Sequence, residues 1–177
     1  EGLFGLKLGE VFDETKFEVT KKELIVDDYW SYEIDWPPNP NTYLKDYSLG
    51  VKNDKTIFQI SANTLSPLPF DEAKARQEDI ANYFIETYFD SYAIYYYNIE
   101  HFMHVYEFIP YDSKIIPLRK DYRKFVHPNE PSKQLTITIG GESDNYKQVE
   151  ILLELKEDDR DDEPSKIYEE DDIKTFD

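Results

Sequence analysis

Two of the three histidines in this chain lie close together, in a segment whose residue types could ligate zinc. Residues 100–104 read EHFMH. In the zinc motif of metalloproteases, two histidines four positions apart share one face of a helix, with a glutamate between them. Here His101 and His104 are three positions apart, the glutamate precedes both, and the neighbours are typical of a strand or turn, which points the two rings to opposite faces. We therefore predict no metal site, and we expect His127, which precedes a proline, to be an exposed loop residue.

The other residue patterns that could support catalysis are either absent from the sequence or do not identify a particular site. The chain has no cysteine, which excludes disulfides, thiolate zinc sites and cysteine nucleophiles. No serine lies in a G-x-S-x-G context and no glycine-rich loop could hold a phosphate. Paired carboxylates of the glycosidase kind can be formed from 38 acidic residues, but their number locates no site. The sequence thus predicts no catalytic residue and no cofactor.

The charge of the chain limits its partners. It has 38 acidic and 20 basic residues, a formal net charge of -18, with the excess concentrated after residue 156. Such a field repels phosphate backbones and anionic lipid headgroups, and it attracts cations. No run of 18 apolar residues could form a membrane-spanning helix. We therefore expect a protein partner, with cationic proteins favoured, no nucleic acid and no integral membrane segment.

Tyrosines are the best candidates for partner binding. The chain has 15 tyrosines, and five of them lie in or beside aromatic strand-like segments: Tyr95, Tyr96, Tyr97, Tyr106 and Tyr111. On a strand some of these rings would face outward, where they could stack on sugars or anchor a protein. The alternative is a two-sided sheet in which the rings pack against a helix on one face and a loop on the other.

The predicted elements consist of many strands and one helix. Strands are expected at residues 3–8, 23–27 and 29–36, and hairpins at 43–51/56–62 and 134–139/149–155. The segments 92–100, 104–109 and 114–124 are expected to form two or three further strands. A short helical turn is expected within 10–28, and a loop with three prolines at 37–41. Residues 71–89 have apolar residues at helical spacing, mainly in their second half. This pattern predicts an α+β fold in which a largely antiparallel sheet is covered on one face by one long helix. We expect one domain over residues 1–156, and an acidic, poorly ordered tail over 157–177.

The start of the chain is similar to that of small exported bacterial proteins. Residues 2–9, GLFGLKLG, resemble the beginning of the mature region of such proteins, of periplasmic or lipoprotein type and of uncharacterised families. The order of the proline segment 38–40, the strand 57–62 and a helix ending near Tyr88 is also similar, although those proteins close the helix with an aromatic-glycine pair where this chain has Phe89-Asp90. The resemblance covers about half of the chain and implies a processed protein in the periplasm or at the cell surface. It transfers no active site.

Three functions stay open on these grounds. The first is a noncatalytic, exported interaction module with an acidic surface and exposed tyrosines. The second is an acidic inhibitor or immunity protein, cytoplasmic in location, that neutralises a basic toxin by electrostatic steering and complementarity. The third is a carboxylate-based glycan hydrolase.

Overall fold

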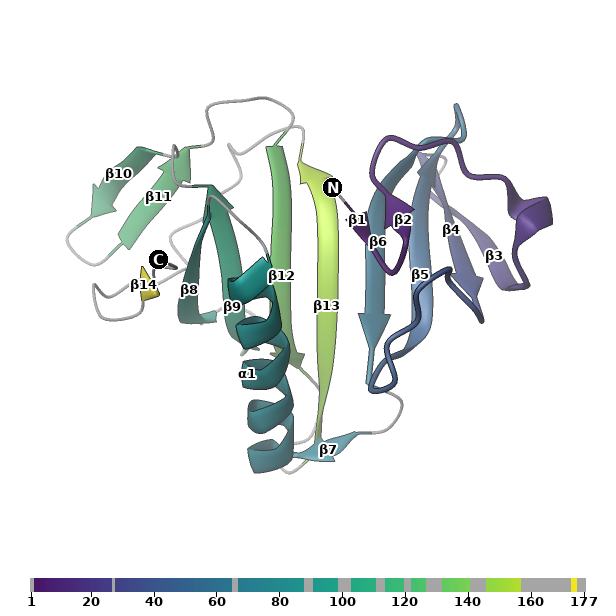
Figure 1. Ribbon diagram of the computed structural model, residues 1–177. Coiled ribbons are helices and arrows are strands. Elements are labelled where there is room, and N and C mark those ends of the chain that lie inside the picture. Colours follow the sequence, from purple (N-terminus) through teal and green to yellow (C-terminus); the bar gives the residue numbers. More distant parts are fainter. Residues whose placement is uncertain are drawn as a thin grey trace.

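The described residues form an antiparallel sheet with one α-helix, seen in the computed structural model of Figure 1. The structure describes residues 2–26, 28–64, 67–87, 91–98, 103–110, 114–119, 122–126, 132–140, 146–156 and 173–174. All pairings between the described strands are antiparallel. The predicted α+β class, with one face of a largely antiparallel sheet covered by one long helix, is confirmed.

In the described parts of the chain, the main sheet has ten strands and joins two antiparallel meanders. The first contains β3 (Val19–Ile25), β4 (Tyr29–Ile34), β5 (Lys45–Lys52) and β6 (Ile57–Asn63). The second contains β8 (Ser91–Asn98), β9 (Met103–Pro110), β12 (Ser132–Gly140) and β13 (Tyr146–Lys156). The short strands β7 (Leu68–Pro69) and β14 (Ile173–Lys174) pair with β13 and β8. Outside this sheet, β1 (Gly2–Leu3) pairs with β2 (Leu6–Lys7), and β10 (Lys114–Arg119) pairs with β11 (Tyr122–Val126).

The two meanders meet where β13 pairs with β6. Ile151 lies opposite Ala62, and Leu153 lies opposite Ile60. These four side chains are almost completely buried. Because side chains alternate along a strand, this register places one continuous apolar face across the junction.

The helix α1 (Phe70–Thr87) covers the half of that face formed by the second meander (Figure 1). Ala73, Ile80 and Ala81 are buried against the sheet. The apolar residues from which this helix is predicted lie mainly in its second half, but its first half is packed on the sheet as well. Ala75 is exposed, and Gln77, in the polar half, has no exposed surface.

Gln77 is buried because its amide is satisfied by the sheet. Its Nε2 donates to the backbone oxygens of His104, at 3.0 Å, and Ile137, at 2.9 Å. Lys74 Nζ donates to its Oε1 at 3.2 Å. A buried polar group with all its partners costs little free energy, so a polar residue can hold the first half of α1 on the sheet.

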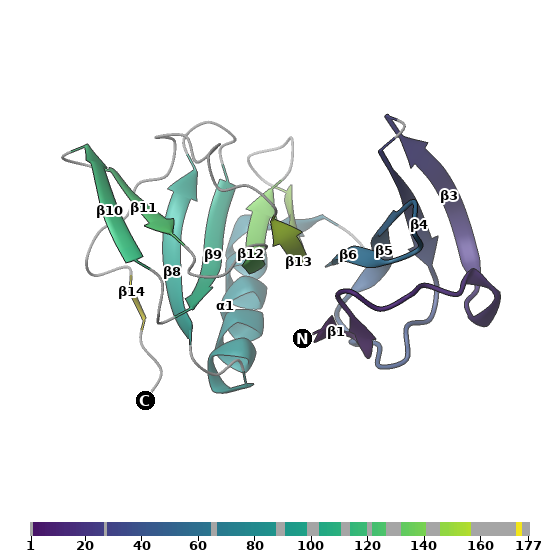
Figure 2. The ribbon, with the colours of Figure 1, turned by 90° about the horizontal axis from the view of Figure 1, so that it is seen from above.

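The hairpin of β1 and β2 covers the other half of the same face. Figure 2 shows α1 and β1 on the same side of the sheet. Leu3 and Leu6 are buried in the core that also holds Phe12, Tyr32 and Leu49. The expected single strand over residues 3–8 is therefore wrong: the chain turns back on itself between Leu3 and Leu6.

The other predicted elements agree in kind with the structure, with shifted ends. The 3₁₀ turn Glu14–Lys16 precedes β3, and the two predicted hairpins are formed by β5 with β6 and by β12 with β13. Of the tail after residue 156, only Ile173–Lys174 falls within the described residues, where these two residues pair with Ile94 and Ala93. No helix within the described ranges combines the length and apolarity that crossing a membrane requires.

Candidate functional site: a cleft between the helix and the proline loop

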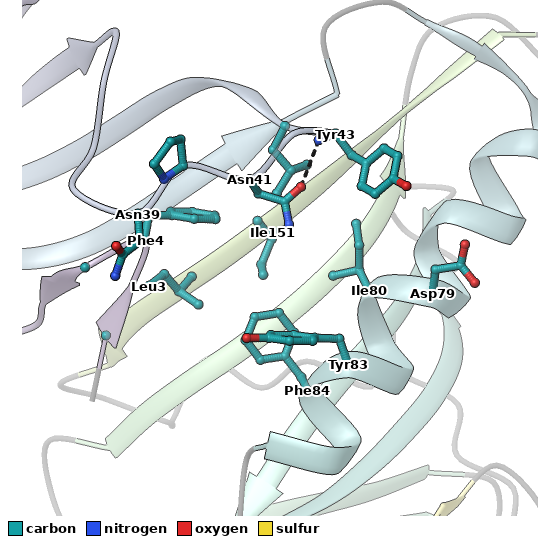
Figure 3. A pocket seen from close by; sticks show the side chains of 14 residues that line it. Leu3, Phe4, Asn39, Asn41, Tyr43, Asp79, Ile80, Tyr83, Phe84 and Ile151 are labelled. Atoms are coloured by element: carbon teal, nitrogen blue, oxygen red, sulfur yellow. Dashed lines mark hydrogen bonds between the residues drawn. The ribbon is translucent and has the colours of Figure 1, made fainter.

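A cleft of about 470 Å³ opens between α1, the β1–β2 hairpin and residues 37–44, which belong to the loop that connects β4 to β5 (Figure 3). We call it the α1 cleft, and we call residues 37–44 the proline loop. The α1 cleft is lined by Gly2, Leu3, Phe4, Gly5, Asn39, Pro40, Asn41, Tyr43, Leu44, Asp79, Ile80, Tyr83, Phe84 and Ile151. The cleft lies where the two elements that cover the sheet leave a gap between them, with Ile151 of β13 on its floor.

The helix provides one wall of the cleft through two neighbouring rows of side chains. Ile80 and Phe84 are four residues apart, as are Asp79 and Tyr83, so each pair lies on one face of the helix. Ile80 is buried, whereas Tyr83 is 62% exposed. The rings of Tyr83 and Phe84 meet edge to face with centroids 5.2 Å apart. This wall therefore has an apolar base, an exposed aromatic ring and a carboxylate at its rim.

The hairpin forms the opposite wall and is attached to the proline loop. Phe4 and Gly5 form its turn, both in the left-handed region, with φ of 57° and 81°. The backbone N–H of Asn39 donates to the backbone oxygen of Phe4 at 2.9 Å. A Cβ at Gly5 would lie 2.7 Å from Cβ of Pro38, so only glycine allows this approach without displacement.

The proline loop is held by its own hydrogen bonds. Asn41 Oδ1 accepts from the backbone N–H of Tyr43 at 2.8 Å, which closes a tight turn. The hydroxyl of Tyr47 accepts from the N–H of Asn41 at 2.9 Å and lies 3.0 Å and 3.1 Å from the backbone oxygens of Asn41 and Leu44. Burial raises the pKa of Tyr47 above its ordinary value, so this hydroxyl keeps its proton. The loop is therefore preorganised around a buried tyrosine.

Polar groups at the cleft are available for a ligand. In Figure 3 the side-chain amide nitrogen of Asn41 points towards Ile151 and the cleft interior. The carboxylate of Asp79 forms no hydrogen bond or ion pair with the part of the chain that the structure describes. Among the described residues that line the cleft, Asp79 is the one carboxylate, so this part of the lining does not contain the carboxylate pair that glycoside hydrolysis requires. The cleft can bind a ligand through aromatic stacking, apolar contacts and a few hydrogen bonds.

Of the five tyrosines singled out in the sequence, the four that the structure describes lie outside the lining of the α1 cleft. Tyr97 is 41% exposed and Tyr95 is half-buried, whereas Tyr96 and Tyr106 are 4% and 3% exposed. Tyr111 lies outside the described residues. Tyr95 and Tyr106 pack against each other with ring centroids 5.1 Å apart, below Lys74, whose Nζ lies 3.6 Å and 5.3 Å from the two ring centroids. Tyr95 and Tyr106 therefore contribute to packing under α1, whereas Tyr96 is buried in a separate cluster with Ile94 and Val105. The role of the five tyrosines in partner binding stays a prediction.

His104 belongs to the same packed cluster. The hydroxyl of Tyr95 is hydrogen-bonded to its Nδ1, and its ring lies 5.2 Å from that of Phe70 and 5.0 Å from that of Tyr97. His101 and His127 lie outside the described residues. Within the described ranges, no group of three or more histidine, aspartate or glutamate side chains is placed to hold a metal ion.

Sequence reasoning missed the residues that line the cleft. Tyr43 and Tyr83 are forty positions apart and lie on a loop and a helix, so no periodicity links them. Tyr83 also lies outside the row of apolar residues whose helical spacing predicts α1. Tyr83 lies beside this apolar row and four residues after Asp79, and this position could have indicated an exposed aromatic ring on a packed helix.

Comparisons with known proteins assign no relative. Searches of protein-family models, curated proteins and solved structures find no match to this chain.

Proposed function

We propose that this chain is a noncatalytic binding module that recognises a segment of a partner protein in the α1 cleft. The observation that carries the proposal is the combination of a preorganised, apolar-floored cleft with exposed Tyr43 and Tyr83 at its rim. Exposed aromatic rings beside an apolar depression are the usual anchors of protein interfaces, because they bury a large area and lose little conformational entropy. Export to the periplasm or cell surface stays a prediction from the sequence.

The polar groups of the cleft favour a peptide segment as the ligand. Asp79 supplies an acceptor and Asn41 a donor, which together suit the N–H and C=O groups of an extended backbone. The net charge of -18 adds attraction for cationic partners and raises the rate of encounter at low salt.

A selection of binders tests the proposal. The intact chain is immobilised and a random peptide library is selected against it, and the affinity of the best peptide is then measured by fluorescence anisotropy. Tyr83→Ala removes an exposed ring at the cleft, so we expect the affinity to fall by at least about tenfold, the size of a moderate hot spot.

Tyr97→Ala is the matched control, because Tyr97 is also an exposed tyrosine but lies on β8 outside the cleft lining. We expect it to change the affinity by less than about twofold. A peptide that binds Tyr83→Ala as tightly as the unchanged chain contradicts the proposal, as does a library that yields no binder.

A further inference from the structure

A second cavity, of about 600 Å³, is also lined in part by the proline loop. We call it the Trp36 pocket. It is lined by Thr20, Glu33, Ile34, Asp35, Trp36, Pro40, Asn41, Thr42, Leu44, Lys45, Asp46 and Tyr47. Pro40, Asn41 and Leu44 line both this pocket and the α1 cleft, so the two depressions adjoin each other at this loop. A segment bound in the cleft therefore needs only a short crossing to reach the pocket.

Trp36 gives this pocket an exposed aromatic face. Its side chain is 70% exposed, although tryptophan is among the residues that gain most from burial. Trp30, the other tryptophan of the chain, is half-buried and has Nζ of Lys22 4.9 Å from its ring centroid. The indole of Trp30 therefore has a cation over its face. Within the described residues, no cation lies over the ring of Trp36.

The charges of the lining fit a cation. Glu33, Asp35 and Asp46 provide three carboxylates, against the single ammonium group of Lys45. None of these four side chains forms an ion pair with a described residue. An aromatic face beside carboxylates suits a guanidinium group, which stacks on the ring and donates to carboxylates through its planar fork, better than it suits the compact, strongly hydrated ammonium of lysine.

We propose that the Trp36 pocket binds an arginine side chain of the partner whose neighbouring segment occupies the α1 cleft; the inference rests on the proposed function. The guanidinium plane lies on the indole of Trp36, and its N–H groups donate to the carboxylates of Asp35 and Asp46. The cleft then supplies apolar anchoring, and the pocket selects for arginine.

Heteronuclear NMR of the intact chain tests the pocket by itself. The probe is N-acetyl-glycyl-arginyl-glycinamide, and the readout is the indole N–H resonance of Trp36, identified by its loss in Trp36→Phe. We expect a saturable shift of this resonance and none of that of Trp30. The peptide with citrulline in place of arginine has nearly the same shape and no charge, and we expect it to leave both resonances in place.

Two variants examine the carboxylates. In Asp35→Asn/Asp46→Asn we expect the dissociation constant of the arginine probe to rise by about tenfold, because the guanidinium then donates to two uncharged amide oxygens instead of two carboxylates. Asparagine suits the left-handed backbone of Asp46, where φ is 51°, so the change preserves the local fold. Asp28→Asn, the same change at an exposed aspartate outside the pocket, should alter the constant by less than about twofold.

Failure of this inference is distinct from failure of the proposed function. An unmoved Trp36 resonance, equal shifts with the citrulline peptide, or equal affinity for the corresponding lysine peptide would overturn the arginine assignment. The cleft proposal would survive any of these results if the library-selected peptide still lost affinity in Tyr83→Ala.

Discussion

Arg76 of α1 lies over the ring of Tyr43 in the proline loop, with its guanidinium carbon 4.1 Å from the ring centroid. This contact connects the helix to the loop beside the rim of the α1 cleft. A cation over an exposed aromatic face contributes about 0.5–1 kcal/mol. The pair therefore helps to set the distance between α1 and the proline loop.

We expect Arg76→Ala to lower the free energy of unfolding by about 0.5–1 kcal/mol, through loss of this cation–π contact. Tyr43→Phe keeps the ring and should leave the stability unchanged. The measurement is urea unfolding of the two single variants, of Tyr43→Ala and of the Arg76→Ala/Tyr43→Ala double variant. A coupling energy near zero in that double-mutant cycle would show that the two side chains are adjacent without stabilising each other.

Gly5 and Gly9 provide a matched pair of positions. Both lie in the left-handed region, with φ of 81° and 83°, but a Cβ at Gly5 meets Pro38 at 2.7 Å whereas a Cβ at Gly9 has nothing within 4 Å. We expect Gly9→Ala to cost about 1–2 kcal/mol from backbone conformation alone. Gly5→Ala should cost more, because the hairpin must also move away from the proline loop.

Chemical unfolding measures both glycine variants, and binding of the selected peptide provides a second readout. Gly5→Ala should weaken that binding, since it displaces one wall of the cleft, and Gly9→Ala should not. Equal losses of stability in the two variants would mean that the contact with Pro38 is relieved at no cost.

Local patterns in the sequence were sufficient to predict most of the elements. The alternation of Leu135, Ile137 and Ile139 with threonines predicted β12, because side chains of a half-buried strand alternate between core and solvent. Helical spacing predicted α1 within one residue of its start. Such patterns depend on neighbours within a few positions, which is why they are readable without the fold.

Features that depend on distant partners were not predictable. Any apolar strand could have paired with β6, and the choice of β13, almost ninety positions away, follows from the packing of the whole sheet. Burial of Gln77 in a polar stretch required carbonyls from β9 and β12. The α1 cleft likewise depends on how the hairpin and the helix divide one face of the sheet, which no single segment encodes.

Gln77 is predicted to be the most sensitive polar residue of α1. Gln77→Leu keeps a similar volume but removes both donors to His104 and Ile137, so we expect a loss of about 1–3 kcal/mol in the free energy of unfolding. Glu78→Gln, at the adjacent exposed position, should change it by less than about 0.5 kcal/mol. Thermal and urea unfolding check both, and a Gln77→Leu variant as stable as the unchanged chain would contradict the role given to this amide.

Glu150 of β13 makes the stability depend on pH. Burial raises the pKa of its carboxyl above the ordinary value, and repulsion from Glu154 adds to the effect. The folded state therefore holds the proton of Glu150 more tightly than the unfolded state does. The stabilisation that this gives is fully present below the ordinary pKa of glutamate and is lost as the pH rises through the raised pKa.

Glu150→Gln isolates this contribution, because glutamine resembles the protonated acid at every pH. We expect the variant to gain stability relative to the unchanged chain as the pH rises through that window, and the difference to level off above it. Urea unfolding from acidic to neutral pH provides the measurement, with Glu10→Gln as a control at an exposed glutamate. A difference between Glu150→Gln and the unchanged chain that is constant across this range would mean that Glu150 titrates alike in the folded and unfolded states, so that its burial carries no electrostatic cost.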